Sequence, residues 1–194
     1  MANIFLLVII MIGWIFSRSV QILVSQNFGA ANYSNIGATV QHAIVVLFPI
    51  GIVLMLLLYL FNGLFLSYII ENQSIHTIAS EICSIRALGM PIVMLTLVFS
   101  GFFTGLGQTK VLFYSQGLAA LTNIILNYML VFGKLGAPAM GYKGSASATV
   151  ISEVIALVVL LIYLCYQSGL IQKYELLIRK RLQFHLIREV MRLA

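Results

Sequence analysis

Long apolar runs alternate with short polar segments along the chain, and five of the runs are long enough to cross a bilayer. A helix needs roughly 20 apolar residues to span the hydrocarbon. Helices are expected rather than strands, because an open sheet edge in lipid leaves backbone groups unpaired. The pattern therefore predicts an all-α membrane protein, a polytopic bundle of about five transmembrane helices. The predicted spans are residues 3–26, 37–61, 82–106, 111–132 and 144–166.

The segments between the runs contain residues that commonly interrupt helices. These joints are rich in Gly, Asn, Gln or Pro. They are residues 27–32, 62–63, 71–74, 107–110 and 133–143. The pattern divides the chain into a transmembrane bundle at residues 1–167 and an amphipathic basic linker at residues 168–194. The linker is expected to lie on the membrane surface.

Composition supports a membrane environment. The chain is 61% hydrophobic and only 8% charged, with a mean hydropathy of +1.06. A soluble domain has roughly 25% charged residues. The net charge of +6 does not indicate a nucleic-acid partner, because six of the eleven Lys and Arg residues lie in the last 22 positions. A basic cluster beside a membrane span favours the cytoplasmic side.

A cytoplasmic C-terminal tail sets the side of every other joint, because each span crosses the membrane once. Lys110 and the turn at residues 27–36 then lie inside. The loop at residues 134–143 and Glu71 then lie outside. The chain would begin on the outer side and contain an odd number of spans. This arrangement indicates a truncated piece of a larger membrane protein.

Four sequence segments carry a resemblance to a known family. Residues 24–30 read VSQNFGA, residues 105–110 read GLGQTK, residues 123–149 form the longest match, and residues 185–194 read HLIREVMRLA. In this order and spacing they resemble the MATE (multidrug and toxic compound extrusion) transporters, and most closely the NorM-type bacterial branch. The resemblance covers nearly the whole chain, as a partial N-lobe consisting of helices two to six and the central linker. Helix one, which carries an aspartate used for cation coupling in prokaryotic members, and the second lobe have no counterpart here.

The resemblance implies a fragment of an antiporter that exports amphipathic cationic compounds in exchange for Na⁺ or H⁺. It implies a multi-pass protein of the bacterial inner (plasma) membrane and no cofactor beyond that coupling ion. The expected partners are the lipid bilayer, cationic drugs in the full-length parent, and the missing second lobe or another copy of the chain. No nucleic-acid partner is expected.

Two alternatives remain open beside the transporter hypothesis. One is a non-transporting truncated remnant. The other is a lipid-precursor flippase of a related family, which is expected to place several Arg or Lys residues in its cavity; Arg18 alone qualifies here. An enzyme is not expected, because the chain has no Asp and none of the common hydrolase, nucleotide-binding or zinc-protease motifs.

Polar residues inside predicted spans are the candidates for cation binding, because they are costly in lipid. Asn123 and Asn127 lie one helical turn apart, so both face the same side of their helix. Their carbonyl oxygens can help to ligate Na⁺ or accept a hydrogen bond from a protonatable partner. In some members of the family that this chain resembles, the first of these two positions is Asn and the second, here Asn127, is a carboxylate. The structural alternative is hydrogen bonding between packed helices.

The next predicted span adds three more candidates. Ser145 or Thr149 can supply a hydroxyl opposite the Asn pair, as the resemblance implies. Glu153 is the one acidic residue deep within a predicted span, and it shares a helix face with Thr149. Desolvation favours the neutral form of a buried carboxyl group, which suits proton binding and release. The alternative is a Glu that pairs with a neighbouring helix for packing. No metal site beyond Na⁺ is expected.

Aromatic and small residues complete the sequence expectations. Phe99, Phe103 and Tyr128 are candidates for lining a path for flat cations, which aromatic faces attract. Gly101 with Gly105, and Gly144 with Ala148, are spaced as small residues at close helix contacts.

Overall fold

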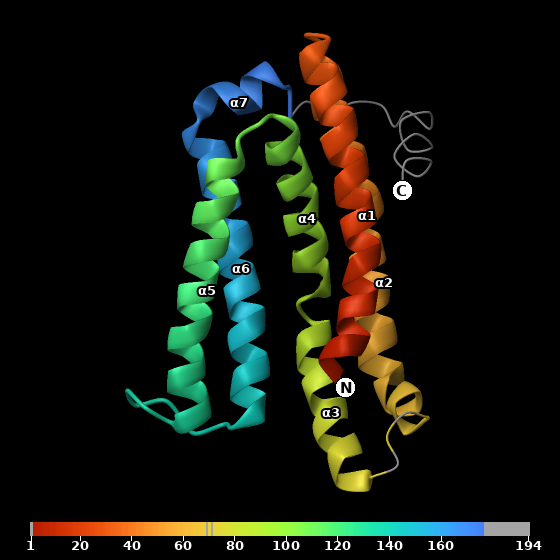
Figure 1. Ribbon diagram of the computed structural model, residues 1–194, viewed down its shortest axis with the longest axis vertical. Helices are drawn as coiled ribbons and strands as arrows, with labels where there is room; N and C mark the ends of the chain where they lie inside the picture. Colours follow the sequence, from red (N-terminus) through yellow and green to blue (C-terminus); the bar gives the residue numbers. More distant parts are fainter. Residues whose placement is uncertain (1, 69, 71, 177–194) are drawn as a thin grey trace.

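The fold is entirely helical in the part of the chain that the computed structural model describes, residues 2–68, 70 and 72–176 (Figure 1). No strand occurs within these residues, which confirms the predicted all-α class. The helices are α1 (Ala2–Gly29), α2 (Tyr33–Ser67), α3 (Gln73–Ala87), α4 (Met90–Gly105), α5 (Thr109–Phe132), α6 (Tyr142–Tyr166) and α7 (Ser168–Lys173).

The long helices run up and down between two ends of the molecule. α4 lies between the α5–α6 pair and the α1–α2 pair, and α3 continues α4 toward the lower end (Figure 1). One end carries the α1–α2 turn, the α4–α5 turn and α7. The opposite end carries the α2–α3 connection and the α5–α6 loop. The joints therefore share ends as the sequence predicted, whichever end faces the cytoplasm.

Several helices are long and apolar enough to cross a membrane. Among the described residues, α2, α5 and α6 meet this description individually, and α3 and α4 meet it together as a bent pair, which corresponds to a broken span or a re-entrant loop. α1 has 28 residues, which corresponds to about 42 Å. Large apolar side chains cover the outside of the bundle, including Leu60 and Ile124, each 66% exposed. Lipid removes the cost of exposing such side chains to water.

α2 is longer than the sequence predicted. The Asn62-Gly63 pair does not end the helix, which continues to Ser67. Asn62 is buried, donates to the Ser84 hydroxyl at 2.9 Å and accepts from the Ser80 hydroxyl, both on α3. Because these contacts satisfy the Asn62 amide, the helix continues through the pair. The expected joint at this position was wrong.

The predicted span 82–106 is divided into two helices. α3 begins earlier, where the Asn72 side chain accepts from the backbone N–H groups of Ser74 and Ile75 and caps the helix. The chain then breaks after Ala87 and bends by 51° before α4. Pro91 lies in the first turn of α4, where it has no N–H to donate and disfavours a helical residue before it.

Glycines allow the helices to approach closely at two interfaces. An added Cβ at Gly101 would lie 2.5 Å from the Ser17 carbonyl oxygen of α1, and one at Gly105 would lie 2.8 Å from the Gln21 carbonyl oxygen. At the α5–α6 interface, a Cβ at Gly144 would lie 2.5 Å from the Leu130 carbonyl oxygen. The sequence prediction of close helix packing is confirmed at these glycines.

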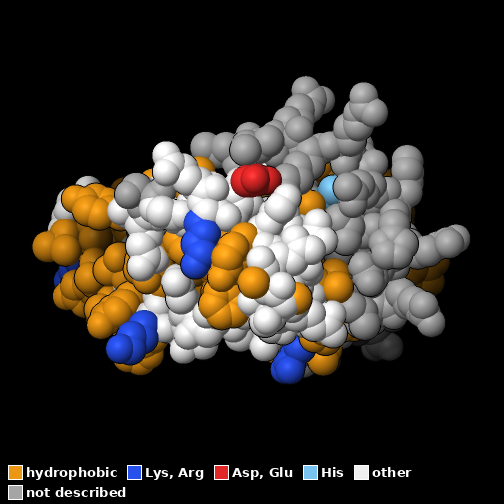
Figure 2. Space-filling model, turned by 90° about the horizontal axis from the view of Figure 1, so that it is seen from above, with side chains coloured by type: hydrophobic (Ala, Val, Ile, Leu, Met, Phe, Trp, Pro, Cys, Tyr) orange, Lys and Arg blue, Asp and Glu red, His pale blue; other side chains and the backbone are white. Residues whose placement is uncertain are grey.

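The described part of the linker packs on one end of the bundle (Figure 1), the end that Figure 2 shows from above. Leu170 and Tyr174 are buried in the same apolar core as helices α1, α2 and α4. The Lys173 Nζ lies 4.6 Å from the centre of the Tyr33 ring. In the space-filling view, charged side chains lie among hydrophobic ones at this end. The remaining basic residues of the predicted linker lie outside the described residues.

Candidate functional site

A cavity of about 460 Å³ opens between α1, α4, α5 and α6. α1 and α4 form one wall and α5 and α6 form the other, so it lies where the two sides of the bundle meet. Polar side chains and one tryptophan interrupt an otherwise apolar lining. These residues are Trp14, Thr96, Ser100, Gln116, Asn123, Thr149, Ser152 and Glu153.

The two candidate asparagines of α5 act together. Asn123 lines the cavity, and Asn127 lies one turn further along the helix. The Asn127 amide donates to the Asn123 backbone carbonyl at 2.9 Å and to the Asn123 Oδ1 at 3.0 Å. The shared face predicted from their spacing is therefore present. Asn127 holds the Asn123 side chain in place, and Asn123 presents its amide to the cavity.

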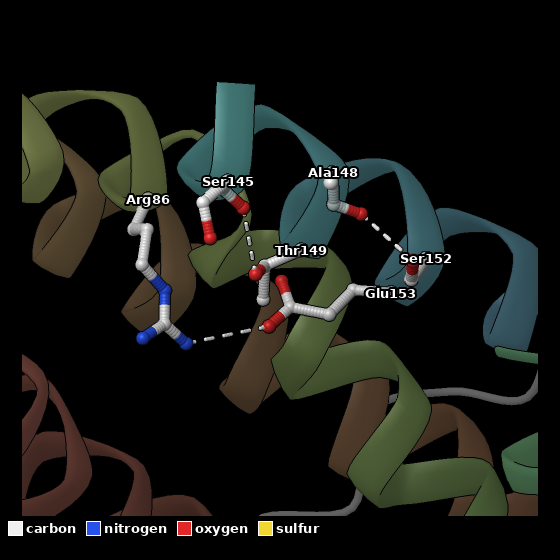
Figure 3. Close-up of polar contacts among 6 residues, drawn as sticks. All are labelled: Arg86, Ser145, Ala148, Thr149, Ser152 and Glu153. Atoms are coloured by element: carbon white, nitrogen blue, oxygen red, sulfur yellow. Dashed lines mark hydrogen bonds and ion pairs between the residues drawn. The ribbon is translucent and has the colours of Figure 1, made fainter. Parts of the chain in front are cut away.

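α6 contributes a polar stripe, shown in Figure 3. Thr149 and Glu153 line the cavity one turn apart. The Thr149 hydroxyl donates to the Ser145 carbonyl at 3.0 Å, and Ser152 donates to the Ala148 carbonyl at 2.7 Å. The Thr149 oxygen keeps lone pairs that can accept or ligate. Ser145 is not among the residues that line the cavity, so the structure places Thr149, rather than Ser145, beside the Asn pair.

Glu153 also makes an ion pair that sequence spacing did not reveal. Its Oε1 lies 3.7 Å from the Arg86 Nη2 at the end of α3, and both side chains are mostly buried (Figure 3). This distance exceeds that of a direct hydrogen bond. Glu153 is the charged residue among those that line the cavity. The carboxylate therefore belongs both to the cavity and to the contact between α3 and α6.

Glu81 of α3 is also paired with residues of α6. Glu81 accepts from the Tyr142 hydroxyl and pairs with the Lys143 Nζ at 3.1 Å. Two ion pairs therefore join α3 to α6, and α3 supplies the acidic residue in one and the basic residue in the other. The Arg86–Glu153 pair lies beside the cavity.

The aromatic candidates occupy other places. Phe99 and Phe103 are buried in the apolar core, where Phe103 packs edge-on against Tyr163. Tyr128 is 52% exposed and lies near Phe132, at the C-terminal end of α5. None of the three is among the residues that line the cavity. The aromatic side chain that does line it is Trp14 of α1.

Several cavity residues were missed by the sequence reasoning. Gln116 precedes Asn123 by two helical turns on the same face, and Thr96 and Ser100 lie one turn apart on α4. Helical spacing from Asn123 could have identified Gln116. Arg18, on which the flippase alternative depends, is not among the cavity residues.

Oxygen and nitrogen groups, rather than a transition-metal ligand set, characterise the cavity. Within residues 2–68, 70 and 72–176, no three His, Cys, Asp or Glu side chains gather as a metal site would require. The carboxylate of Glu153, the amide of Asn123 and the hydroxyl of Thr149 instead supply oxygen atoms of the kind that hard cations bind.

Comparison with known proteins identifies relatives over most of the chain. The MatE family model matches residues 1–129. A probable multidrug resistance protein NorM of Photorhabdus laumondii is 40% identical over 121 residues, which are 62% of this chain and 26% of the relative. A probable multidrug resistance protein YoeA of Bacillus subtilis is 31% identical over 143 residues, or 74% of this chain and 31% of the relative.

A match to a NorM protein of Agrobacterium fabrum extends over 196 residues at 27% identity and covers 100% of this chain and 42% of the relative. A solved structure of the inward-facing conformation of a multidrug resistance MATE family transporter of the MOP superfamily has the same fold, with a TM-score of 0.77 at 17% identity. It matches 93% of this chain, which spans 40% of that structure. The chain therefore spans less than half the length of these relatives.

Proposed function

Because this chain belongs to the MatE family of multidrug efflux transporters, we propose that it contributes a cation-binding half-site to a cation-coupled antiporter. The observation that carries the proposal is the cavity between α1, α4, α5 and α6, into which Asn123, Thr149 and Glu153 converge. A transporter that exchanges a drug for Na⁺ or H⁺ needs a buried site with cation-binding oxygen atoms near the middle of the membrane.

The polarity of the cavity suits a coupling ion. The carboxylate of Glu153 supplies negative charge, and the Asn123 amide oxygen and Thr149 hydroxyl supply neutral ligands on the same α5–α6 wall of the cavity. In a low-dielectric surrounding, a single carboxylate attracts a cation far more strongly than it does in water. Na⁺ can be held by all three oxygen groups, and H⁺ by the carboxylate alone.

The apolar part of the cavity suits an amphipathic organic cation. A volume of about 460 Å³ lies within the range of small-molecule sites. The Trp14 ring offers an aromatic face for a delocalised positive charge. We therefore propose cationic, partly aromatic drugs as substrates, in a family whose relatives are named as probable multidrug resistance proteins.

We further propose that the protein lies in a bacterial inner membrane, with the end that carries α7 in the cytoplasm. The relatives reported above come from bacteria, and the basic linker that follows α7 favours the cytoplasmic side. The chain covers 31% of the Bacillus YoeA protein and 26% of the Photorhabdus NorM protein. Alternating access then requires a second lobe from elsewhere.

The orientation can be tested by cysteine labelling. In a variant in which Cys83 and Cys165 are replaced by serine, a Lys134→Cys change is expected to react with an impermeant maleimide from outside intact cells. A Lys110→Cys change is expected to react only after the cells are opened, because α5 separates the two positions. Labelling of position 110 from outside would overturn the orientation.

Transport can be tested with a chimera. Residues 1–194 replace the matching segment of the Agrobacterium NorM protein, which the chain matches over its whole length, and ethidium efflux is measured in a bacterium without its own efflux pumps. Energy-dependent efflux above the vector control is expected from the chimera. No such efflux is expected from residues 1–194 expressed alone, since alternating access needs two lobes.

Membrane abundance is measured for both proteins in the same experiment. A chimera that reaches the membrane at the level of the NorM protein but exports no ethidium contradicts the antiporter proposal. Export by residues 1–194 alone would contradict the requirement for a second lobe.

A further inference from the structure

The Glu153 carboxylate lies where three structural features meet. One of its oxygens faces the Arg86 guanidinium at 3.7 Å, and the side chain also lines the cavity. The third feature is the break between α3 and α4. A Cβ added to Gly89, at that break, would lie only 2.5 Å from the Glu153 Oε2. The carboxylate is thus seated directly against the backbone of the bend.

The carboxylate oxygen lies in space that a side chain at position 89 would occupy. A larger residue at Gly89 would push the end of the flexible Glu153 side chain away from the bend. Gly89 is also the N-cap residue of α4, so the carboxylate lies at the N-terminal end of a 16-residue helix. The dipole of a helix favours negative charge at this end. Arg86 on one side and the α4 N-terminus on the other therefore both hold the carboxylate against the bend.

The bend is the place where α3 and α4 can change their angle to each other. α3 and α4 meet at 51° across a two-residue break, and Pro91, in the first turn of α4, has no N–H with which to continue the hydrogen-bond pattern of α3. The Gly89 N–H donates to the Arg86 carbonyl at 3.0 Å, which closes the last turn of α3. The residue that pairs with Glu153 is thus part of the turn that ends α3, so a change at the carboxylate acts directly on the bend.

We propose that Arg86 is an internal counter-cation that latches the α3–α4 bend to α6 through Glu153, and that a cation entering the cavity competes with it. The incoming cation takes the Glu153 carboxylate, the Arg86–Glu153 ion pair breaks, and the bend is released from this contact with α6. Arg86 is a positioning residue in this scheme and does not touch the transported cation. The proposal rests on the proposed function, because it assumes that cations enter the cavity.

The geometry favours exchange over a permanent structural pair. At 3.7 Å the Arg86–Glu153 contact lacks the short, direct geometry of the strongest charge-assisted pairs. The carboxylate also has one face toward an open cavity of about 460 Å³, so a second cation can approach without displacing the helices first. The second α3–α6 pair, Glu81 with Lys143, is shorter at 3.1 Å and lies away from the cavity.

The single tryptophan of the chain allows a direct test, because Trp14 lines the cavity. Purified residues 1–194 in detergent are titrated with tetraphenylphosphonium while Trp14 fluorescence is recorded. We expect Arg86→Gln to lower the half-quenching concentration about tenfold, since the internal competitor is gone. We expect Arg86→Lys, which keeps the charge, to stay within about twofold of the unmodified chain.

Variants of Glu153, alone and combined with Arg86→Gln, complete the set of binding measurements. Glu153→Gln is expected to raise the half-quenching concentration at least tenfold, an order-of-magnitude loss for removing the charge. In this background, Arg86→Gln is expected to have no further effect. The matched control is Lys143→Gln, which breaks the other α3–α6 ion pair and is expected to leave quenching unchanged. Gly89→Ala, which pushes the carboxylate off its seat, is expected to tighten binding in the same direction as Arg86→Gln.

Release of the bend has its own readout. Hydrogen exchange of the backbone at residues 86–90 is expected to speed up when tetraphenylphosphonium binds, and to be fast without it in Arg86→Gln. An absence of quenching in the unmodified chain contradicts the proposed function itself. Normal quenching that Arg86→Gln and Gly89→Ala both leave unchanged or weaken overturns the latch alone, as does exchange at the bend that does not respond to the cation.

Discussion

Replacing Gly101 with valine is expected to destabilise the bundle more than any other single change considered above. The first side-chain carbon would lie 2.5 Å from the Ser17 carbonyl oxygen and 3.2 Å from the Val20 side chain. The neighbour at 2.5 Å is backbone, so it cannot move aside without shifting α1 against α4. Overpacking of this kind costs about 1–3 kcal/mol. A lower midpoint of thermal unfolding and a severalfold lower membrane abundance are the expected results.

The matched control for this prediction is Gly117→Val on α5. Gly117 also lies within a long helix, but a Cβ there meets no atom within 4 Å. Both variants place a β-branched residue in a helix, so the difference between them measures packing alone. Circular dichroism melts of the two purified variants provide the comparison. Equal melting temperatures would show that α1 and α4 do not pack as closely as described.

Changing Asn123 to alanine is expected to abolish drug efflux in the chimera with the Agrobacterium protein, without lowering its abundance. Asn123 presents its amide to the cavity that Thr149 and Glu153 also line. Removing one polar partner of a buried charged ligand costs about 1.5–3 kcal/mol, which corresponds to a loss on the order of tenfold to a hundredfold. Ethidium efflux, normalised to protein in the membrane, is the measurement.

Asn127→Ala separates binding from packing in this test. Asn127 does not line the cavity and acts through its hydrogen bonds to Asn123. A smaller loss of efflux is therefore expected, since Asn123 keeps its oxygen but loses an orienting partner. If Asn123→Ala instead reduces abundance and efflux in equal proportion, the two asparagines serve the packing of the helices, as the structural alternative holds.

Features that depend on residues close together in the sequence could be predicted from the sequence. The apolar runs predicted helices because a bilayer demands about 20 apolar residues and satisfied backbone groups over each span. The spacing of Asn123 and Asn127 predicted one shared face, and the structure joins them by hydrogen bonds. Gly101 and Gly105 predicted a close helix contact, which the structure places against α1. Each of these follows from the helical repeat alone.

The candidate site was only partly visible in this way. Asn123, Thr149 and Glu153 were identified because polar groups are rare and costly within apolar runs. Phe99 and Phe103 were expected to line a path, but an aromatic residue in an apolar run faces the core, the lipid or a cavity with the same local pattern. Trp14 was missed for the same reason. Nothing in its neighbours distinguishes it from a residue that faces lipid.

The amino-acid sequence by itself determined the helices, the ends that their joints share and the faces on which polar and small residues lie. These depend on local spacing and on the cost of burying polar groups in lipid. Only the tertiary structure decided that α2 continues past Asn62 and that the chain bends at Gly89. It alone paired Glu153 with Arg86 rather than with a residue of its own helix. These features arise where helices far apart in the chain meet, and which faces meet is set by the packing of the whole bundle.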